Sequence, residues 1–302
     1  MKRHVWTVCF AVVLIAFTVY LALDTFVIAK VYDGNAVETN TSMFADTEAE
    51  EPSAPETDGA AYAGENSYSD GNVSVTLTEY EEYGTTIYVA DVTLSSAEYL
   101  KTAFANDAYG KNVTATTSSI AEANGAILAI NGDFYGSQEK GYVIRNGVVY
   151  RDTAKGAEVL CIFADGTMKV VNDSDYTADE LAEAGVWQAF SFGPGLVENG
   201  VISVDENDEV GRAKASNPRT AIGLIDANHF VFVVSDGRTD ESEGLSLYEL
   251  AKFMQSLGVK EAYNLDGGGS STMYFNGEVV NNPTSGGRIK EREVSDIVYV
   301  GT

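Results

Sequence analysis

The sequence predicts an α+β protein: a sheet-dominated domain with mixed or antiparallel pairing and a few packing helices, behind an N-terminal transmembrane anchor. Three observations lead there. A long uncharged segment lies at the N-terminus, short apolar runs alternate with hairpin-type turn dipeptides, and only two segments carry clear helix signals. We therefore divide the chain into a signal-anchor over residues 1–30, a disordered acidic linker over 31–71 and one domain over 72–302.

The anchor prediction depends on the length of the first apolar run. Lys2 and Arg3 precede residues 5–23, which carry no charge. At ~1.5 Å per residue this run approaches the ~30 Å hydrocarbon core of a bilayer. A cleaved signal peptide is the alternative, but the run is long and no small-residue cleavage site follows it. Basic residues before the run favour a single-pass protein of the cell membrane with its C-terminal domain extracytoplasmic.

The acidic residues are concentrated after the anchor. Residues 31–71 hold ten Asp or Glu and no Lys or Arg, and large apolar side chains are sparse there. Such a segment cannot offset the entropy of ordering the chain, so we expect a flexible tether. The net charge of −26 argues against a nucleic-acid partner, because phosphate backbones are bound by clustered Lys and Arg. The sequence says nothing of oligomeric state.

Hairpin turns account for most of the predicted sheet. Each of the dipeptides concerned readily adopts positive φ values and separates two apolar runs. They are Asn146-Gly147, Asp165-Gly166, Asn199-Gly200 and Asn276-Gly277.

Two helices have recognisable start signals. Ser246 and Glu249 form a capping box, an apolar stripe follows, and Gly258 ends the helix. A shorter helix is predicted to start at Ser119, with Glu122 completing its box.

Polar residues follow three apolar strands at the point where each strand ends. The strands over 126–130, 230–234 and 261–263 run into turns that contain Asp133, Asp236 and Asp266. A fourth segment, 217–220, directly precedes the strand over 221–225 and contains Arg219. Strands this apolar are expected to be buried neighbours in one sheet, so their ends share one edge. We therefore expect three carboxylates, two arginines and a glycine-rich loop in one crevice.

The glycine-rich loop is the most specific of these features. Three consecutive glycines, 267–269, cost conformational entropy and pack no side chain, and their usual benefit is close approach of the backbone to an anion. The loop is not a Walker motif, since no Lys follows it. Nor is it a dinucleotide fingerprint, because a strand and not a helix comes next.

The scarcity of histidine and cysteine excludes several mechanisms. His4 lies in the anchor and His229 in a turn, whereas Cys9 lies in the anchor and Cys161 in an apolar run. A Ser-His-Asp triad, a Cys-His pair, a disulfide framework and a zinc site of the usual His and Cys type are therefore not expected. Catalysis must use Asp or Glu, with Arg to neutralise an anion. No cofactor is expected to be required; the acidity leaves room for a divalent cation such as calcium, but no ligand spacing specifies one.

These motifs resemble those of the phosphodiester glycosidase family. The matching blocks are "AINGDFYG" at 129–136, "FSFGPGLVENG" at 190–200, "NPRTAIG" at 217–223, "VVSDGR" at 233–238 and "NLDGGGSSTM" at 264–273, and "REVSDIVYV" at 292–300 resembles the closing strand. They cover most of residues 85–300. Anchor and tether lie outside the resemblance.

The resemblance implies a set of active-site residues. The implied catalytic residues are Asp133, Asp236, Asp266, Arg219 and Arg238, with acid and nucleophile unassigned. The implied substrate-binding residues are Asn131, Gly132, Thr220, Asn264, Gly267, Gly268, Gly269, Ser270 and Ser271.

The implied activity is removal of a sugar from a glycosyl-1-phosphodiester, on a phosphodiester-linked glycan of the cell envelope. Two alternatives stay open. One is a non-catalytic carbohydrate-binding or scaffold module, and the other is a phosphodiesterase that cleaves the P–O bond. The sugar, its anomer and the acceptor cannot be identified from the sequence.

Overall fold

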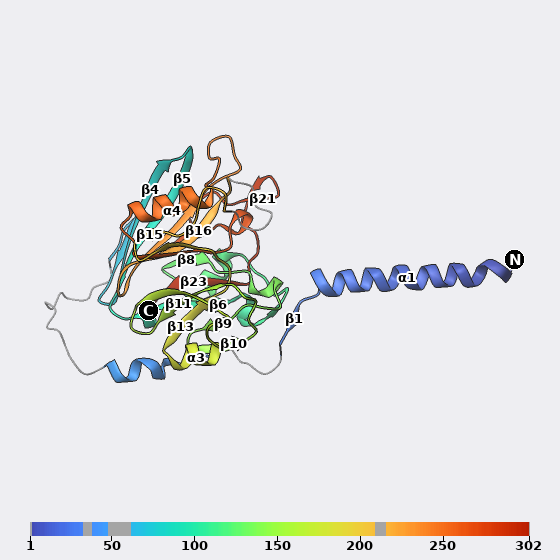
Figure 1. Cartoon of the computed structure of the whole chain (residues 1–302). Coiled ribbons are helices and arrows are strands. Elements are labelled where there is room, and N and C mark those ends of the chain that lie inside the picture. The colour runs from blue at the N-terminus through green and yellow to red at the C-terminus, as the bar shows by residue number, and fades with distance from the viewer. Residues whose placement is uncertain (1, 33–37, 48–61, 209–215, 302) are drawn as a thin grey trace.

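The computed structural model describes residues 2–32, 38–47, 62–208 and 216–301. Its largest element is a nine-stranded sheet in which every neighbouring pair is antiparallel (Figure 1). The strands in spatial order are β15 (Val201–Ile202), β14 (Gly195–Glu198), β18 (Glu261–Asn264), β16 (Arg219–Asp226), β17 (His229–Ser235), β5 (Thr85–Leu94), β4 (Val73–Glu82), β3 (Ser67–Ser69) and β2 (Tyr62–Ala63).

Two five-stranded antiparallel sheets complete the domain. One has the order β20 (Glu278–Val279), β19 (Met273–Phe275), β8 (Leu128–Asn131), β23 (Asp296–Val300) and β6 (Leu100–Phe104). The other has the order β10 (Val148–Arg151), β9 (Val143–Arg145), β13 (Val186–Phe190), β11 (Glu158–Phe163) and β12 (Met168–Asn172). Two short pairs are β1 (Lys30–Val31) with β7 (Gly110–Lys111), and β21 (Thr284–Ser285) with β22 (Arg288–Ile289). The predicted sheet-dominated class is confirmed.

The nine-stranded sheet is buried on both faces. On one face Phe232 and Ile222 join a core cluster with Ile130 and Val298 of the β8–β23 sheet. On the other face α4 (Leu247–Ser256) lies over the sheet, as Figure 1 shows. A second core cluster joins residues of α4 to residues of the strands. Burial of both faces explains why β17 is an almost continuous apolar run instead of an alternating one.

All four predicted hairpin turns are confirmed. They connect β9 to β10, β11 to β12, β14 to β15 and β19 to β20. In each turn the glycine has positive φ, and the asparagines of three of them do as well.

The helices agree with the sequence only in part. The capping box of Ser246 and Glu249 on α4 is confirmed. However, α2 (Thr117–Ala123) begins after Thr116, whose hydroxyl accepts a hydrogen bond from the Ser119 amide, so the predicted start was three residues late. The helix α3 (Ala178–Glu183) was not predicted, although it carries its own capping box. Short 3₁₀ turns are η1 (Thr41–Thr47), η2 (Ala97–Tyr99), η3 (Ala105–Asp107), η4 (Tyr135–Ser137) and η5 (Gly268–Ser270).

The N-terminal helix α1 (Lys2–Phe26) projects from the domain (Figure 1). Its residues Val5–Phe26 are long and apolar enough to cross a membrane, a property that a signal sequence shares. Directly after it, β1 pairs with β7, and the Asn112 side chain donates hydrogen bonds to the carbonyls of Thr25 and Ile28 at 3.2 and 3.1 Å.

The predicted linker contains ordered segments. β3 pairs with β4, so the large sheet begins before residue 72. Residues 38–47 lie on the domain: the Asn40 amide donates to the Asn146 carbonyl at 2.8 Å, and Phe44 contacts Trp187 edge to face at 4.9 Å. The domain boundary at residue 71 was therefore wrong. The tether prediction for 33–37 and 48–61 falls outside the described residues.

The capping box makes a stability prediction. Replacing Ser246 with Ala removes the acceptor for the Glu249 amide and should lower the free energy of unfolding by about 1 kcal/mol. Urea denaturation of the full chain followed by circular dichroism measures it. As a control, Ser256→Ala at the other end of α4 removes only a hydroxyl that donates to the Phe253 carbonyl, and should cost less than about 0.5 kcal/mol. Equal losses would contradict the capping role.

Candidate active site

Three strand ends meet at one edge of the nine-stranded sheet. β16 lies between β17 and β18, and both neighbours run antiparallel to it. Arg219, the first residue of β16, is opposite Ser235, the last residue of β17. Asn264, the last residue of β18, is opposite Ala221. The predicted shared edge is confirmed for these strands, whereas β8 belongs to a different sheet.

The side chain of Asn131 joins β8 to this edge. Its Oδ1 accepts a hydrogen bond from Thr220 Oγ1 at 2.9 Å, and its Nδ2 donates to the Asp266 carbonyl at 2.6 Å. Asn131 and Thr220 are both fully buried. They therefore fix the backbone of Asp266 from beneath and do not line an open surface.

A pocket of about 390 Å³ opens above this edge. Three guanidinium groups and one carboxylate are among its lining groups. Its walls are Phe134, Phe192, Asn217, Arg219, Arg238, Asn264, Asp266, Gly267, Gly268 and Arg292. The lining is net positive in a chain whose net charge is −26, so the pocket suits an anion.

The two predicted arginines line the pocket from β16 and from the turn after β17. Arg219 is buried, and its Nε donates to the Leu245 carbonyl at 2.8 Å. Arg238 follows β17 in the left-handed region, at φ +64°, and its Nε and Nη2 donate to Asn217 Oδ1 at 3.2 and 2.9 Å. These contacts fix both guanidinium groups before any ligand arrives.

A third arginine, Arg292, was not among the predicted site residues. Its Nη2 pairs with Asp266 Oδ2 at 2.8 Å, and its Nε donates to Ser270 Oγ at 2.9 Å. The sequence did contain a signal for Arg292, because it is the first residue of the block 292–300 that resembles the family. We considered only the strand within that block. Arg292, Asp266 and Phe134 also line a neighbouring pocket of about 360 Å³, together with Ser270.

Asp266 is the carboxylate of the pocket. Burial raises its pKa, while the Arg292 guanidinium and the Ser270 hydroxyl, which donates to Oδ2 at 2.6 Å, oppose that increase. Its carboxyl group therefore has one polar side, toward Arg292, and a less hydrated environment elsewhere. A base or nucleophile benefits from such partial desolvation.

The glycine-rich loop serves the site differently from the expected anion cradle. The amides of Gly268, Ser270 and Ser271 already donate to carbonyls of Pro218, Gly267 and Gly268. The glycines instead make room for neighbouring groups. A Cβ on Gly268, which has φ +63°, would lie 2.7 Å from Arg238 Nη2, and one on Gly267 would lie 2.9 Å from the Pro218 carbonyl oxygen. Gly269 packs in the same way against Ser285.

The other two predicted aspartates do not line the pocket. Asp133 Oδ2 accepts from the Ser191 amide at 2.9 Å, and its Oδ1 accepts from the Tyr135 amide and Arg145. Asp236 accepts three hydrogen bonds from Asn281 and Asn282. Of the three aspartates that we expected in one crevice, Asp266 is the one that lines this pocket. A residue beside a turn can either hold that turn or face a ligand, and both of these carboxylates hold turns.

A buried ion cluster lies behind the pocket. Arg145 Nη2 contacts Asp133 Oδ1 at 3.1 Å and Asp296 Oδ2 at 2.7 Å, and its guanidinium lies 4.2 Å from the Phe190 ring centroid. Gly132 packs against Asp296, where a Cβ would approach Oδ1 to 2.4 Å. Burial first, and then the charge of Asp133, raise the pKa of Asp296 to about 7 despite Arg145. Within the described chain, Asp296 Oδ1 has no hydrogen-bond partner.

Metal-binding groups are not clustered in the described ranges. No set of three or more His, Cys, Asp or Glu side chains there is arranged to hold a metal ion.

Comparison with known proteins shows the family of this chain. A model of the phosphodiester glycosidase family matches residues 124–301, which include every residue that lines the pocket. The chain belongs to the phosphodiester glycosidase family.

The curated relatives that the chain matches are longer proteins. The SPbeta prophage-derived uncharacterized protein YomE of Bacillus subtilis is 32% identical over 198 residues, 64% of this chain and 30% of its own length. Mouse N-acetylglucosamine-1-phosphodiester alpha-N-acetylglucosaminidase is 33% identical over 109 residues, 35% of this chain and 21% of its own length. The aligned region thus spans a third or less of each of these relatives.

Two solved structures share the fold of this chain. The catalytic domain of the zebrafish N-acetylglucosamine-1-phosphodiester alpha-N-acetylglucosaminidase, auto-inhibited by its pro-peptide, superposes with a TM-score of 0.61 at 19% identity, covering 76% of this chain and 83% of that one. A hypothetical protein from Synechocystis superposes with a TM-score of 0.52 at 16% identity, covering 76% and 62%.

The packing of Gly268 makes the first prediction for the site. In Gly268→Val the new side chain should displace Arg238 and weaken binding of inorganic phosphate at least about tenfold, or ~1.4 kcal/mol, by calorimetry. Gly200→Val is the matched control, because Gly200 also has positive φ, at +76°, but has open space around its Cβ. The control should lose stability and keep its phosphate affinity; equal weakening in both variants would remove the loop from the site.

The ion cluster makes a prediction for pH. Because the folded-state pKa of Asp296 lies above the ~3.9 of an unfolded Asp, the folded state holds the extra proton between about pH 4 and 7. The resulting stability is present at low pH and is lost as pH rises through this window, with a slope of up to about 1.4 kcal/mol per pH unit. In Asp296→Asn, urea denaturation at several pH values should show this component removed. Identical slopes in the variant and the parent would contradict the shifted pKa.

Proposed function

We propose that this chain is a hydrolase that removes a sugar from a glycosyl-1-phosphodiester. In the proposed reaction the bond between the anomeric carbon and the phosphate oxygen breaks. The oxygen of water ends on the sugar, and the remaining phosphate monoester leaves. Membership of the phosphodiester glycosidase family supports this reaction type.

The observation that carries the proposal is the charge of the pocket. Arg219, Arg238 and Arg292 converge with a single carboxylate, Asp266, although the chain as a whole repels anions. A guanidinium can contact two phosphate oxygens at once, so these arginines suit a phosphodiester. A neutral sugar would not require their positive charge. Contacts to Leu245 and Asn217 hold two of these groups in place, so little ordering is needed on binding.

Two aromatic rings provide a surface for the sugar. Phe134 and Phe192 both line the pocket, with ring centroids 5.4 Å apart in an edge-to-face arrangement. Phe134 is 36% exposed, so its ring is accessible to a ligand. An aromatic face can cover the apolar face of a sugar ring while the polar lining contacts its hydroxyl groups.

Asp266 is the carboxylate that we assign to the chemistry. As a nucleophile it would attack the anomeric carbon, and as a base it would take a proton from the attacking water. A phosphate leaves without prior protonation, so the second carboxylic acid of the usual glycosidase pair is not required. We assign Asp133 and Asp236 to positioning, since their oxygens accept hydrogen bonds from the surrounding turns.

We further propose that the reaction takes place outside the cytoplasm, on a cell-envelope glycan. The apolar helix over Val5–Phe26 and the basic residues before it support a single-pass anchor with the domain outside. An anchored exterior enzyme would meet envelope phosphodiesters first.

Hydrolysis in ¹⁸O-labelled water tests the proposed reaction. A glycosyl-1-phosphodiester is incubated with the full chain, and the products are analysed by mass spectrometry. Label in the sugar is the expected result. Label in the phosphate would identify a phosphodiesterase that cleaves the P–O bond, and absence of turnover with retained binding would identify a non-catalytic carbohydrate-binding module.

The arginines make a substrate-dependent prediction. Arg238→Lys keeps the charge but loses the planar pair of donors, so kcat/KM for a glycosyl-1-phosphodiester should fall about 10²–10³-fold, on the order of 2–4 kcal/mol. With a neutral aryl glycoside of the same sugar the loss should be small. The exposed Arg288 of β22 provides the control, and Arg288→Lys should leave both rates unchanged. Equal losses of Arg238→Lys on the two substrates would show that Arg238 supports the site and does not bind phosphate.

A further inference from the structure

A second pocket lies at the other end of strand β13 from the candidate active site. Its volume is about 380 Å³. Trp187, near the start of β13, lines it, whereas Phe192, two residues beyond the end of that strand, lines the candidate active site. Trp187 and Phe192 are five residues apart, which corresponds to about 17 Å of extended chain. The walls of the second pocket are Thr39, Thr41, Glu98, Tyr99, Lys101, Asn146, Trp187 and Tyr299.

The polar groups on these walls are available to a ligand. Six of the side chains make no hydrogen bond or ion pair to any residue in the described part of the chain. They are Thr39, Thr41, Glu98, Tyr99, Lys101 and Tyr299. The Asn146 side chain and the Trp187 indole N–H are satisfied internally, the latter by the Leu100 carbonyl at 2.6 Å. The pocket therefore combines four hydroxyl groups, one ammonium and one carboxylate on a rigid base.

The two charges of this pocket balance each other. Lys101 is partly buried; desolvation lowers the pKa of its ammonium, and the nearby charge of Glu98 opposes that change. One cation and one anion leave the lining neutral, in contrast to the three arginines and single carboxylate of the candidate active site. A phosphate has no advantage here, whereas a ligand with many hydroxyl groups can accept from Lys101 and donate to Glu98.

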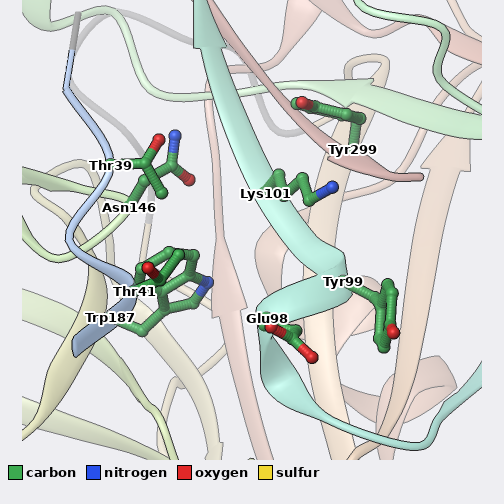
Figure 2. A pocket seen from close by; sticks show the side chains of 8 residues that line it. All are labelled: Thr39, Thr41, Glu98, Tyr99, Lys101, Asn146, Trp187 and Tyr299. Atoms are coloured by element: carbon green, nitrogen blue, oxygen red, sulfur yellow. The ribbon is translucent and has the colours of Figure 1, made fainter. Parts of the chain in front are cut away.

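Aromatic side chains and an N-terminal segment shape the walls. Figure 2 shows Lys101 extending toward the side of Tyr99 and Tyr299, with Trp187 and Thr41 across the opening. The segment 38–47 forms the far wall and is held there by Phe44, which packs against Trp187. Aromatic faces with polar groups between them are the lining expected for a sugar ring.

We propose that this pocket is a second carbohydrate-binding site, which takes an uncharged sugar unit of a glycan and is separate from the candidate active site. Lys101 and Glu98 pair with its hydroxyl groups, and Tyr99 and Tyr299 cover its apolar faces. The site would hold a polymeric glycan on the domain without taking part in hydrolysis.

The two tryptophans of the chain allow this site to be observed directly. Trp6 lies in α1, so Trp6→Phe leaves Trp187 as the single tryptophan. The full-length Trp6→Phe chain, in a detergent without a sugar headgroup, is titrated with maltotriose, cellotriose and chitotriose, and both Trp187 fluorescence and heat are recorded. Binding of at least one of these with a Kd on the order of 1 mM or tighter, accompanied by a change in Trp187 emission, is expected.

Variants distinguish the two pockets. Lys101→Met keeps the length and apolar stem of the side chain and should weaken saccharide binding at least tenfold, with the thermal midpoint and the hydrolysis of a small glycosyl-1-phosphodiester unchanged. Arg238→Ala should leave saccharide binding intact. The proposal is overturned if none of the saccharides binds, or if binding survives Lys101→Met and is lost in Arg238→Ala. Neither outcome would bear on the hydrolase proposal, which is tested by its own substrates.

Discussion

The buried guanidinium of Arg145 connects the parts on which the candidate site depends. From β9 it reaches Asp296 at the start of β23 and Asp133 in the turn after β8, so one side chain joins the two five-stranded sheets. Asp133 in turn accepts a hydrogen bond from the Ser191 amide, which fixes the chain just before Phe192. Phe134 is the residue directly after Asp133, so it is held by the same contacts. Both aromatic walls of the pocket are thus positioned by one ion cluster. Burying these charges is costly, and the cost is offset only because they are paired and hydrogen-bonded.

The strand ends of the site could be predicted because burial leaves a clear pattern in the sequence. β17 is an almost continuous buried apolar run and β18 buries Ala262 and Tyr263, so the polar residues that follow these strands were expected at an edge. The direction of each side chain could not be predicted in the same way. Asp236 and Asp266 have similar neighbours along the chain, yet one holds a turn with Asn281 and Asn282 and the other lines the pocket. That difference depends on partners far away in sequence.

Features with no local pattern were missed for the same reason. Arg292 reaches Asp266 from 26 residues further along the chain, and nothing around it marks it as a pocket residue. β3 has little apolar content of its own, and its order comes from pairing with β4. The three glycines were singled out for anion binding, but they also allow close packing: a Cβ on Gly268 would meet Arg238, one on Gly267 the Pro218 carbonyl and one on Gly269 the Ser285 side chain. The Gly268 amide already donates to the Pro218 carbonyl.

The pairing of β1 with β7 has a consequence for where the domain can work. Only three residues separate the end of α1 at Phe26 from the start of β1 at Lys30, and Asn112 ties the carbonyls of Thr25 and Ile28 to the domain. With α1 in a bilayer, as we propose, this junction would be a short, fixed connection and not a long, flexible linker. The domain would stay at a nearly fixed height above the lipid headgroups, and its substrates would be drawn from the layer of the envelope next to the membrane.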